Sequence, residues 1–87
     1  MNEYSCYVCG YYTLESRCDW DVCPICFWED DILADDGLYE HSPANHMTIA
    51  EAKKNYIALG AVSQEYVSKV RKPVARERRD PAWTPAM

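Results

Sequence analysis

The chain has 87 residues, five of them cysteine, and a formal net charge of −5. At this size a hydrophobic core alone gives marginal stability, so we expect a metal ion or a cross-link to support the fold. The beginning, MNEYSCYVCG, has no basic patch followed by an apolar run. We therefore expect no signal peptide, no membrane span and a cytoplasmic location, where clustered thiols bind metal rather than form disulfides.

Charge is divided unevenly along the chain. Residues 1–52 carry eleven acidic side chains against the single Arg17, a formal charge of −10, whereas residues 53–87 carry eight basic side chains against three acidic ones, or +5. A zinc ion held by four thiolates adds about −2 to the first half, because Zn²⁺ neutralises only two of the four thiolates. Such a field repels nucleic acid and attracts a basic protein partner.

Two Cys-x-x-Cys pairs dominate the first part of the chain. Residues 4–14 are rich in aromatic and β-branched side chains and contain the turn CYVCG, which predicts a short hairpin with Gly10 free to adopt positive φ. Polar residues 15–21 connect it to a second turn, CPIC. Two residues between cysteines let both sulfurs of a turn converge on one ion. The predicted metal ligands are Cys6, Cys9, Cys23 and Cys26.

Other side chains could extend this site. Cys18 is interpreted as a bystander thiol, with a reactive thiol or an alternate ligand as the alternatives. His41 and His46 are interpreted as exposed loop histidines, because their spacing matches no ligand pattern; a second site with Asp35 or Asp36 is the alternative. Four thiolates leave no open position on the ion for water or substrate, so we expect a structural site and no enzyme activity.

Acidic and apolar residues alternate after the second turn. Residues 29–47 contain Gly37 and Pro43 and show no sustained period, which predicts a long loop. The acids lack the pattern of a calcium-binding loop, and a solvated acidic face is the simplest interpretation. The alternative is a surface for a cationic partner with apolar anchors. Its candidate residues are Trp28, Glu29, Asp30, Asp31, Leu33, Asp35, Asp36, Leu38 and Tyr39.

A capping box predicts the start of a helix over residues 49–59. Thr48 is placed to cap the helix and Glu51 to reach back to the backbone N–H of the cap residue, while Gly60 is placed to end the helix. The inward face is expected to hold Ile49, Ala52, Tyr56 and Leu59.

A second helix is expected over residues 64–71, capped by Ser63. Val67 and Val70 are predicted to face inward, with Tyr66 beside them. Residues 73–87 hold three prolines and a run of charge, which predicts a flexible tail. Trp83 is the obvious anchor in that tail, and docking on its own domain or on a partner chain is left open. We therefore divide the chain into a domain over 1–72 and a tail over 73–87.

The segment CYVCGYYTLESRCDWDVCPICFWEDD resembles the signature of the bacterial cysteine-rich CPCC family, and NHMTIAEAKKNYIALGAVS resembles that family's downstream helix. Together they cover roughly residues 4–72. The first pair departs from the family by reading CYVC in place of CPCC, but it keeps both outer ligands. The same turns are similar to rubredoxin-like domains, which bind one iron for electron transfer.

These resemblances imply a small α+β fold, with zinc-ribbon or rubredoxin-like hairpin knuckles followed by two short α-helices and the tail. The expected cofactor is one Zn²⁺, with one iron as the alternative. The leading functional hypothesis is an immunity-type inhibitor that binds and neutralises a cationic toxin, for example a nuclease. The alternatives are an iron electron carrier and a nucleic-acid binder. The last would use Arg71, Lys72, Arg76, Arg78 and Arg79, against the repulsion of the acidic half.

Overall fold

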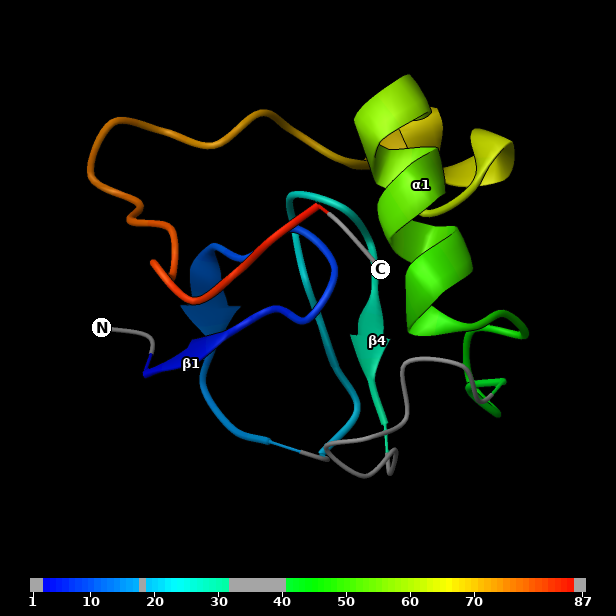
Figure 1. Cartoon of the computed structure of the whole chain (residues 1–87), viewed down its shortest axis with the longest axis horizontal. Helices are drawn as coiled ribbons and strands as arrows, with labels where there is room; N and C mark the ends of the chain where they lie inside the picture. The colour runs from blue at the N-terminus through cyan, green and yellow to red at the C-terminus, as the bar shows by residue number, and fades with distance from the viewer. Residues whose placement is uncertain (1–2, 18, 32–40, 86–87) are drawn as a thin grey trace.

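A computed structural model describes residues 3–17, 19–31 and 41–85 of the chain (Figure 1). Two antiparallel hairpins come first, then one α-helix and one 3-10 helix. The C-terminal segment, which we define as residues 73–85, returns across the first hairpin (orange to red in Figure 1). The structure therefore confirms a small domain with two hairpins and a helix, and it corrects the second α-helix, as described below.

Each hairpin encloses one Cys-x-x-Cys turn. Strand β1 (Tyr4–Ser5) pairs with β2 (Tyr12–Leu14), and the register shifts between the two residues of β1. Strand β3 (Asp21–Val22) pairs with β4 (Glu29–Asp30) in regular register. These strands are too short to be stable as isolated hairpins, so their stability must come from the residues packed between them.

Arg17, the single basic residue of the acidic half, joins the two hairpins. Its guanidinium group pairs with the Asp30 carboxylate on β4 at 3.0 Å and donates to the Ser5 carbonyl on β1 at 2.7 Å. It also lies over the Tyr7 ring, 4.3 Å from the ring centre. Because Asp30 is buried, this pairing compensates a carboxylate that would be costly to leave alone.

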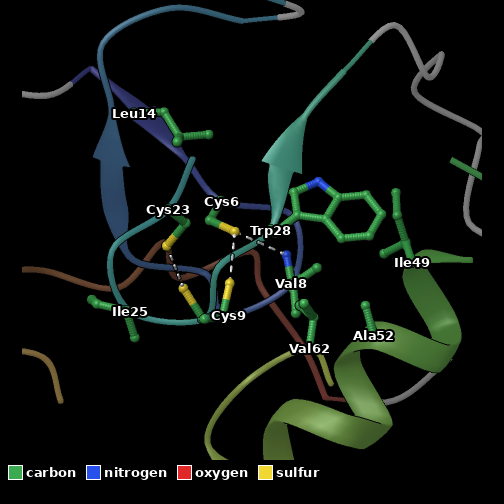
Figure 2. Packing of buried hydrophobic residues seen from close by; sticks show 11 residues of the cluster. Cys6, Val8, Cys9, Leu14, Cys23, Ile25, Trp28, Ile49, Ala52 and Val62 are labelled. Atoms are coloured by element: carbon green, nitrogen blue, oxygen red, sulfur yellow. Dashed lines mark hydrogen bonds between the residues drawn. The ribbon is translucent and has the colours of Figure 1, made fainter. Parts of the chain in front are cut away.

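The four cysteines of the two turns lie in the centre of the hydrophobic core. Val8, Leu14, Ile25 and Trp28 from the hairpins pack around them and are almost fully buried. Helix α1 (Ile49–Leu59) adds Ile49 and Ala52, and Val62 follows the helix (Figure 2). The core is therefore built around the cysteine cluster, and the apolar side chains form a layer around the four cysteines.

Helix α1 (Ile49–Leu59) begins and ends where the sequence predicts. The Thr48 hydroxyl accepts from the Glu51 N–H at 3.0 Å and donates to the Glu51 carboxylate. Gly60 ends the helix with φ of 84°, a left-handed conformation that favours glycine. The predicted inward face is correct at its first turns only, because Leu59 is 40% exposed where the helix runs past the core. Lys53, not predicted, is buried.

The second predicted helix is wrong in type and in its inward face. Residues Gln64–Lys69 form a 3-10 helix, η2, and the Ser63 side chain makes no capping hydrogen bond. Val67 is 39% exposed, whereas Tyr66 stacks on Phe27 with ring centres 4.3 Å apart. With three residues per turn, an anchor at Tyr66 directs Val67 away from the core.

The C-terminal segment docks on the domain of its own chain. Residues Tyr11 and Arg79 form an antiparallel β-bridge. On either side of the bridge, the Tyr12 N–H donates to the Arg78 carbonyl at 3.0 Å and the Asp80 N–H donates to the Gly10 carbonyl at 2.7 Å. The segment thus lies along the outer edge of β2, where these backbone groups would otherwise face solvent. Within the described residues, no helix has the length and apolar character that crossing a membrane requires.

Candidate metal centre

The sulfur atoms of Cys6, Cys9, Cys23 and Cys26 form a tight group. All four lie within 4.8 Å of one another, with 3.5 Å between the Cys6 and Cys26 sulfurs and 3.6 Å between those of Cys9 and Cys23. A tetrahedral zinc with Zn–S bonds of about 2.3 Å places its ligands about 3.8 Å apart. The donor set and its spacing therefore fit one four-coordinate ion of this kind, and iron held by four thiolates has the same donor set.

The two turns share one backbone conformation, which directs their sulfurs inward. In each turn, the N–H four residues after the first cysteine donates back to that cysteine's carbonyl: Gly10 to Cys6 at 2.9 Å and Phe27 to Cys23 at 2.8 Å. Both donors have left-handed backbones, with φ of 82° for Gly10 and 72° for Phe27. Sequence reasoning singled out Gly10 alone. Phe27 lies four residues after Cys23, as Gly10 does after Cys6, and this matching position was the signal for a second left-handed residue.

Two hydrogen-bond donors support the sulfurs. The Val8 N–H donates to the Cys6 sulfur at 3.4 Å, as expected for a turn of this kind (Figure 2). The Thr13 hydroxyl, on β2, donates to the Cys23 sulfur at 3.1 Å. Such contacts orient a thiolate and offset its charge. Sequence reasoning missed Thr13; its signal is a lone polar side chain on the inward face of an otherwise apolar strand.

Burial disfavours the charged thiolate form of the four cysteines unless a cation is bound beside them. All four sulfur-bearing side chains are at most 1% exposed. Burial raises the pKa of the Cys6 and Cys26 thiols, whereas hydrogen bonds, first from Cys26 and then from Cys6, lower the pKa of Cys23. Several thiolates at this depth repel one another, and a bound dication removes most of that cost. The arrangement is therefore suited to a metal ion and unfavourable as four free thiolates.

The two histidines were interpreted as exposed loop residues, and the structure confirms this and does not bring them into the group. His41 and His46 are exposed, and the His41 Nε2 atom lies 3.8 Å from a Glu51 carboxylate oxygen. Among residues 3–17, 19–31 and 41–85, the cluster of metal-binding groups comprises the four cysteines. Cys18, together with Asp35 and Asp36, lies outside the described residues.

Among the described residues directly after the second turn, the acidic side chains are mostly internal. Trp28, Asp30 and Asp31 are each at most 3% exposed, and Glu29 is half-buried. Asp31 accepts from the Ser42 hydroxyl and from the Ala44 N–H, and so holds the turn before α1. Partner contacts from Trp28, Asp30 and Asp31 are therefore corrected to structural roles, because their side chains are already used inside the fold. Of the remaining candidates, Glu29 keeps a partly exposed side chain, and its role in binding a partner stays a prediction. The other candidates, Leu33, Asp35, Asp36, Leu38 and Tyr39, lie outside the described residues.

Among the described residues of the hairpins, Trp20 is the most exposed of the large aromatic side chains, ahead of Tyr4 on β1. The Trp20 side chain is 47% exposed and its backbone has a φ of 64°. Its backbone N–H donates to the Asp30 carbonyl at 2.9 Å. Asp19 is exposed beside it, and Val22 on β3 is 42% exposed. Sequence reasoning treated this stretch as a polar connector. The overlooked signal is a tryptophan between two aspartates in the segment that joins the two Cys-x-x-Cys turns.

Two hairpins that converge four cysteines on one point, followed by a capped helix, define a small cysteine-knuckle domain with a candidate metal site, an arrangement that fits a zinc-ribbon-like fold. The profile of the cysteine-rich CPCC family matches residues 4–77, and the chain belongs to that family. This match confirms the resemblance drawn from the sequence and extends it into the C-terminal segment. Neither the curated proteins nor the solved structures gave a match.

Proposed function

We propose that this protein is a zinc-stabilised protein-interaction module that binds a basic protein. Its function in the cell would be that of an immunity-type inhibitor, which neutralises a cationic toxin such as a nuclease, and it would have no enzyme activity of its own. The observation that carries the proposal is the buried four-cysteine cluster at the centre of a small, acidic hairpin domain. A centre of this kind builds a surface and leaves recognition to the residues displayed on it.

Zinc is favoured over iron because the four ligands are enclosed. Every cysteine is at most 1% exposed, and the C-terminal segment lies over the first turn. Electron transfer through a four-thiolate iron site is helped by a ligand close to the surface, whereas a structural zinc gains from complete enclosure. Four protein ligands also leave no position for a reacting water, which supports the absence of catalysis.

The surface around Trp20 is the part of the described fold best suited to a basic partner. Two acidic residues flank this tryptophan in the chain, the exposed Asp19 and the half-exposed Asp21, and the Asp21 carboxylate accepts from the N–H of the exposed Glu15 at 3.0 Å. A tryptophan anchor supplies contact area while the acids steer a cationic surface toward it. The backbone hydrogen bond from Trp20 to Asp30 fixes the anchor, which lowers the entropy cost of binding.

Elemental analysis of the purified protein with its visible spectrum tests the metal. We expect one zinc per chain and no colour. One iron with thiolate absorption would replace the proposal with an electron carrier. Removing the metal with a chelator is expected to unfold the hairpins, because binding of structural zinc supplies about 10 kcal/mol of folding free energy in small domains. Replacement of Cys23→Ser should have nearly the same effect, measured by circular dichroism and thermal melting.

Affinity capture from the source organism tests the partner. The wild-type protein is expected to retain a basic protein, and the double variant Asp19→Asn with Trp20→Ala is expected to lose it. Ile57→Ala is the matched control, because Ile57 is an apolar side chain on α1 that is 59% exposed. Recovery of no basic protein, or equal recovery by the double variant, would contradict the proposed interaction. Inhibition of the captured protein's activity would then test the immunity role.

A further inference from the structure

The first metal turn is the Cys-x-x-Cys turn of residues 6–10. Three of its successive carbonyl groups accept hydrogen bonds from the C-terminal segment. The Trp83 indole N–H donates to the Val8 carbonyl at 2.9 Å and the Arg79 Nε–H donates to the Cys9 carbonyl at 2.9 Å. The Asp80 N–H donates to the Gly10 carbonyl at 2.7 Å. These carbonyls belong to the ligand Cys9 and to its two neighbours. Movement of this ligand away from an ion therefore requires the segment to detach or move with it.

The side chains of the segment also cover the turn. The Arg79 guanidinium group lies between two rings, 4.5 Å from the centre of Tyr11 and 4.0 Å from that of Trp83. Trp83 packs directly on Gly10, where a Cβ atom would lie 2.8 Å from the Trp83 Cβ and Cδ1 atoms. A guanidinium stacked between aromatic rings is held in place by cation–π attraction. It places a positive charge beside a turn that supplies two of the four thiolates.

Helix α1 holds the far end of the segment. The Lys53 ammonium group donates to the Thr84 carbonyl at 3.0 Å and lies 5.9 Å from the centre of the Trp83 ring. Lys53 is 8% exposed although it is charged, so its position is set by this contact. The segment is thereby fastened at the β2 edge by its backbone and at α1 by Lys53.

From these contacts we infer that residues 78–84 form a strap that is part of the metal centre and controls how fast the ion leaves. This inference rests on the proposed metal binding and deepens it. A four-thiolate ion is lost when one pair of ligands swings away from it, and the strap holds the Cys6–Cys9 pair at three consecutive carbonyls. The positive charge of Arg79 also offsets the negative charge of a zinc bound by four thiolates. Without the strap, the four cysteines still bind the ion and release it sooner.

The test measures transfer of zinc from the loaded protein to an excess of the coloured chelator 4-(2-pyridylazo)resorcinol. The main variant combines Arg79→Gln with Trp83→Ala and removes two of the three donors. Its matched control combines Arg76→Gln with Val74→Ala, because both residues are exposed in the same segment and the change in charge is the same. We expect the main variant to bind one zinc and to release it at least 10-fold faster than the wild type. The control should release zinc at the wild-type rate.

Equal release rates for the main variant and the wild type would overturn the strap, as would equal acceleration in the control. If the main variant does not fold, Trp83→Phe decides, because it keeps a ring and removes only the donor to Val8. A faster release from Trp83→Phe supports the strap, and an unchanged rate refutes it. Absence of zinc from the wild type is a separate result, which refutes the proposed metal and is seen before any rate is measured.

Discussion

Substitution of Gly10→Ala tests how closely the C-terminal segment packs on the metal turn. Gly10 has a φ of 82°, and a left-handed backbone costs a residue with a Cβ atom about 1–2 kcal/mol. The new Cβ would also lie 2.8 Å from two atoms of Trp83, closer than side chains pack, so the ring must move away. Both effects lower the free energy of unfolding.

The cost of displacing Trp83 follows from its contacts. The ring is half-buried, so about 80 Å² of apolar surface would return to water, at a cost of about 2 kcal/mol. Loss of the hydrogen bond to the Val8 carbonyl adds about 1 kcal/mol. With the backbone strain included, Gly10→Ala is expected to destabilise the zinc-loaded protein by about 4–5 kcal/mol.

A double-mutant cycle separates the two effects. In a Trp83→Gly background, which lacks the Cβ atom of residue 83 as well as the ring, only the backbone strain remains, so Gly10→Ala should cost about 1–2 kcal/mol. The coupling between the two positions is then about 3 kcal/mol, measured by urea unfolding of the zinc-loaded proteins followed by circular dichroism. An equal cost of Gly10→Ala in both backgrounds would show that Trp83 does not pack on this turn.

Three further results are expected. Thr13→Val removes the hydroxyl that donates to the Cys23 sulfur and should weaken zinc affinity by about 10-fold in a competition titration, whereas Thr13→Ser should retain it. Thr48→Ala removes the cap of α1 and should lower the free energy of unfolding by about 1 kcal/mol; an unchanged melting temperature would contradict this role of the hydroxyl. Burial raises the pKa of Tyr56 from 10.0 to about 12, so the folded state keeps the phenol protonated where the unfolded chain ionises it. Stability contributed by Tyr56 should therefore be complete below pH 10 and be lost between pH 10 and pH 12, by about 1 kcal/mol after allowance for solvent screening. Tyr56→Phe lacks this loss, and parallel pH curves for the two proteins would refute the assignment.

Short-range patterns predicted the parts of this protein that local chemistry decides. The four-cysteine cluster was predicted because two residues between cysteines already allow a pair of sulfurs to converge on one point, whatever the rest of the chain does. Helix α1 was found from Thr48 and Gly60, since a cap acts on backbone groups within four residues. Each of these signals lies within one turn of chain.

Burial of the acidic run was decided by contacts that a local pattern does not contain. Asp30 and Asp31 look like surface residues until Arg17 and the turn at Ser42 are placed beside them. Their carboxylates are then satisfied inside the fold, and the surface tryptophan is Trp20 rather than Trp28. Sequence alone could not choose between two tryptophans eight residues apart, because exposure depends on which face of the second hairpin meets the core.

The position of the C-terminal segment also depends on contacts that no local pattern contains, between residues far apart in the chain. Its prolines and charges predict a flexible tail, and no local rule joins Trp83 to Val8 or Asp80 to Ser5, pairs that are 75 residues apart. The sequence by itself determined the two cysteine pairs, the two hairpins and α1, because each depends on neighbours along the chain. The tertiary structure decided what covers them, because burial and long-range hydrogen bonds exist only after the cysteine-centred core has brought distant segments together.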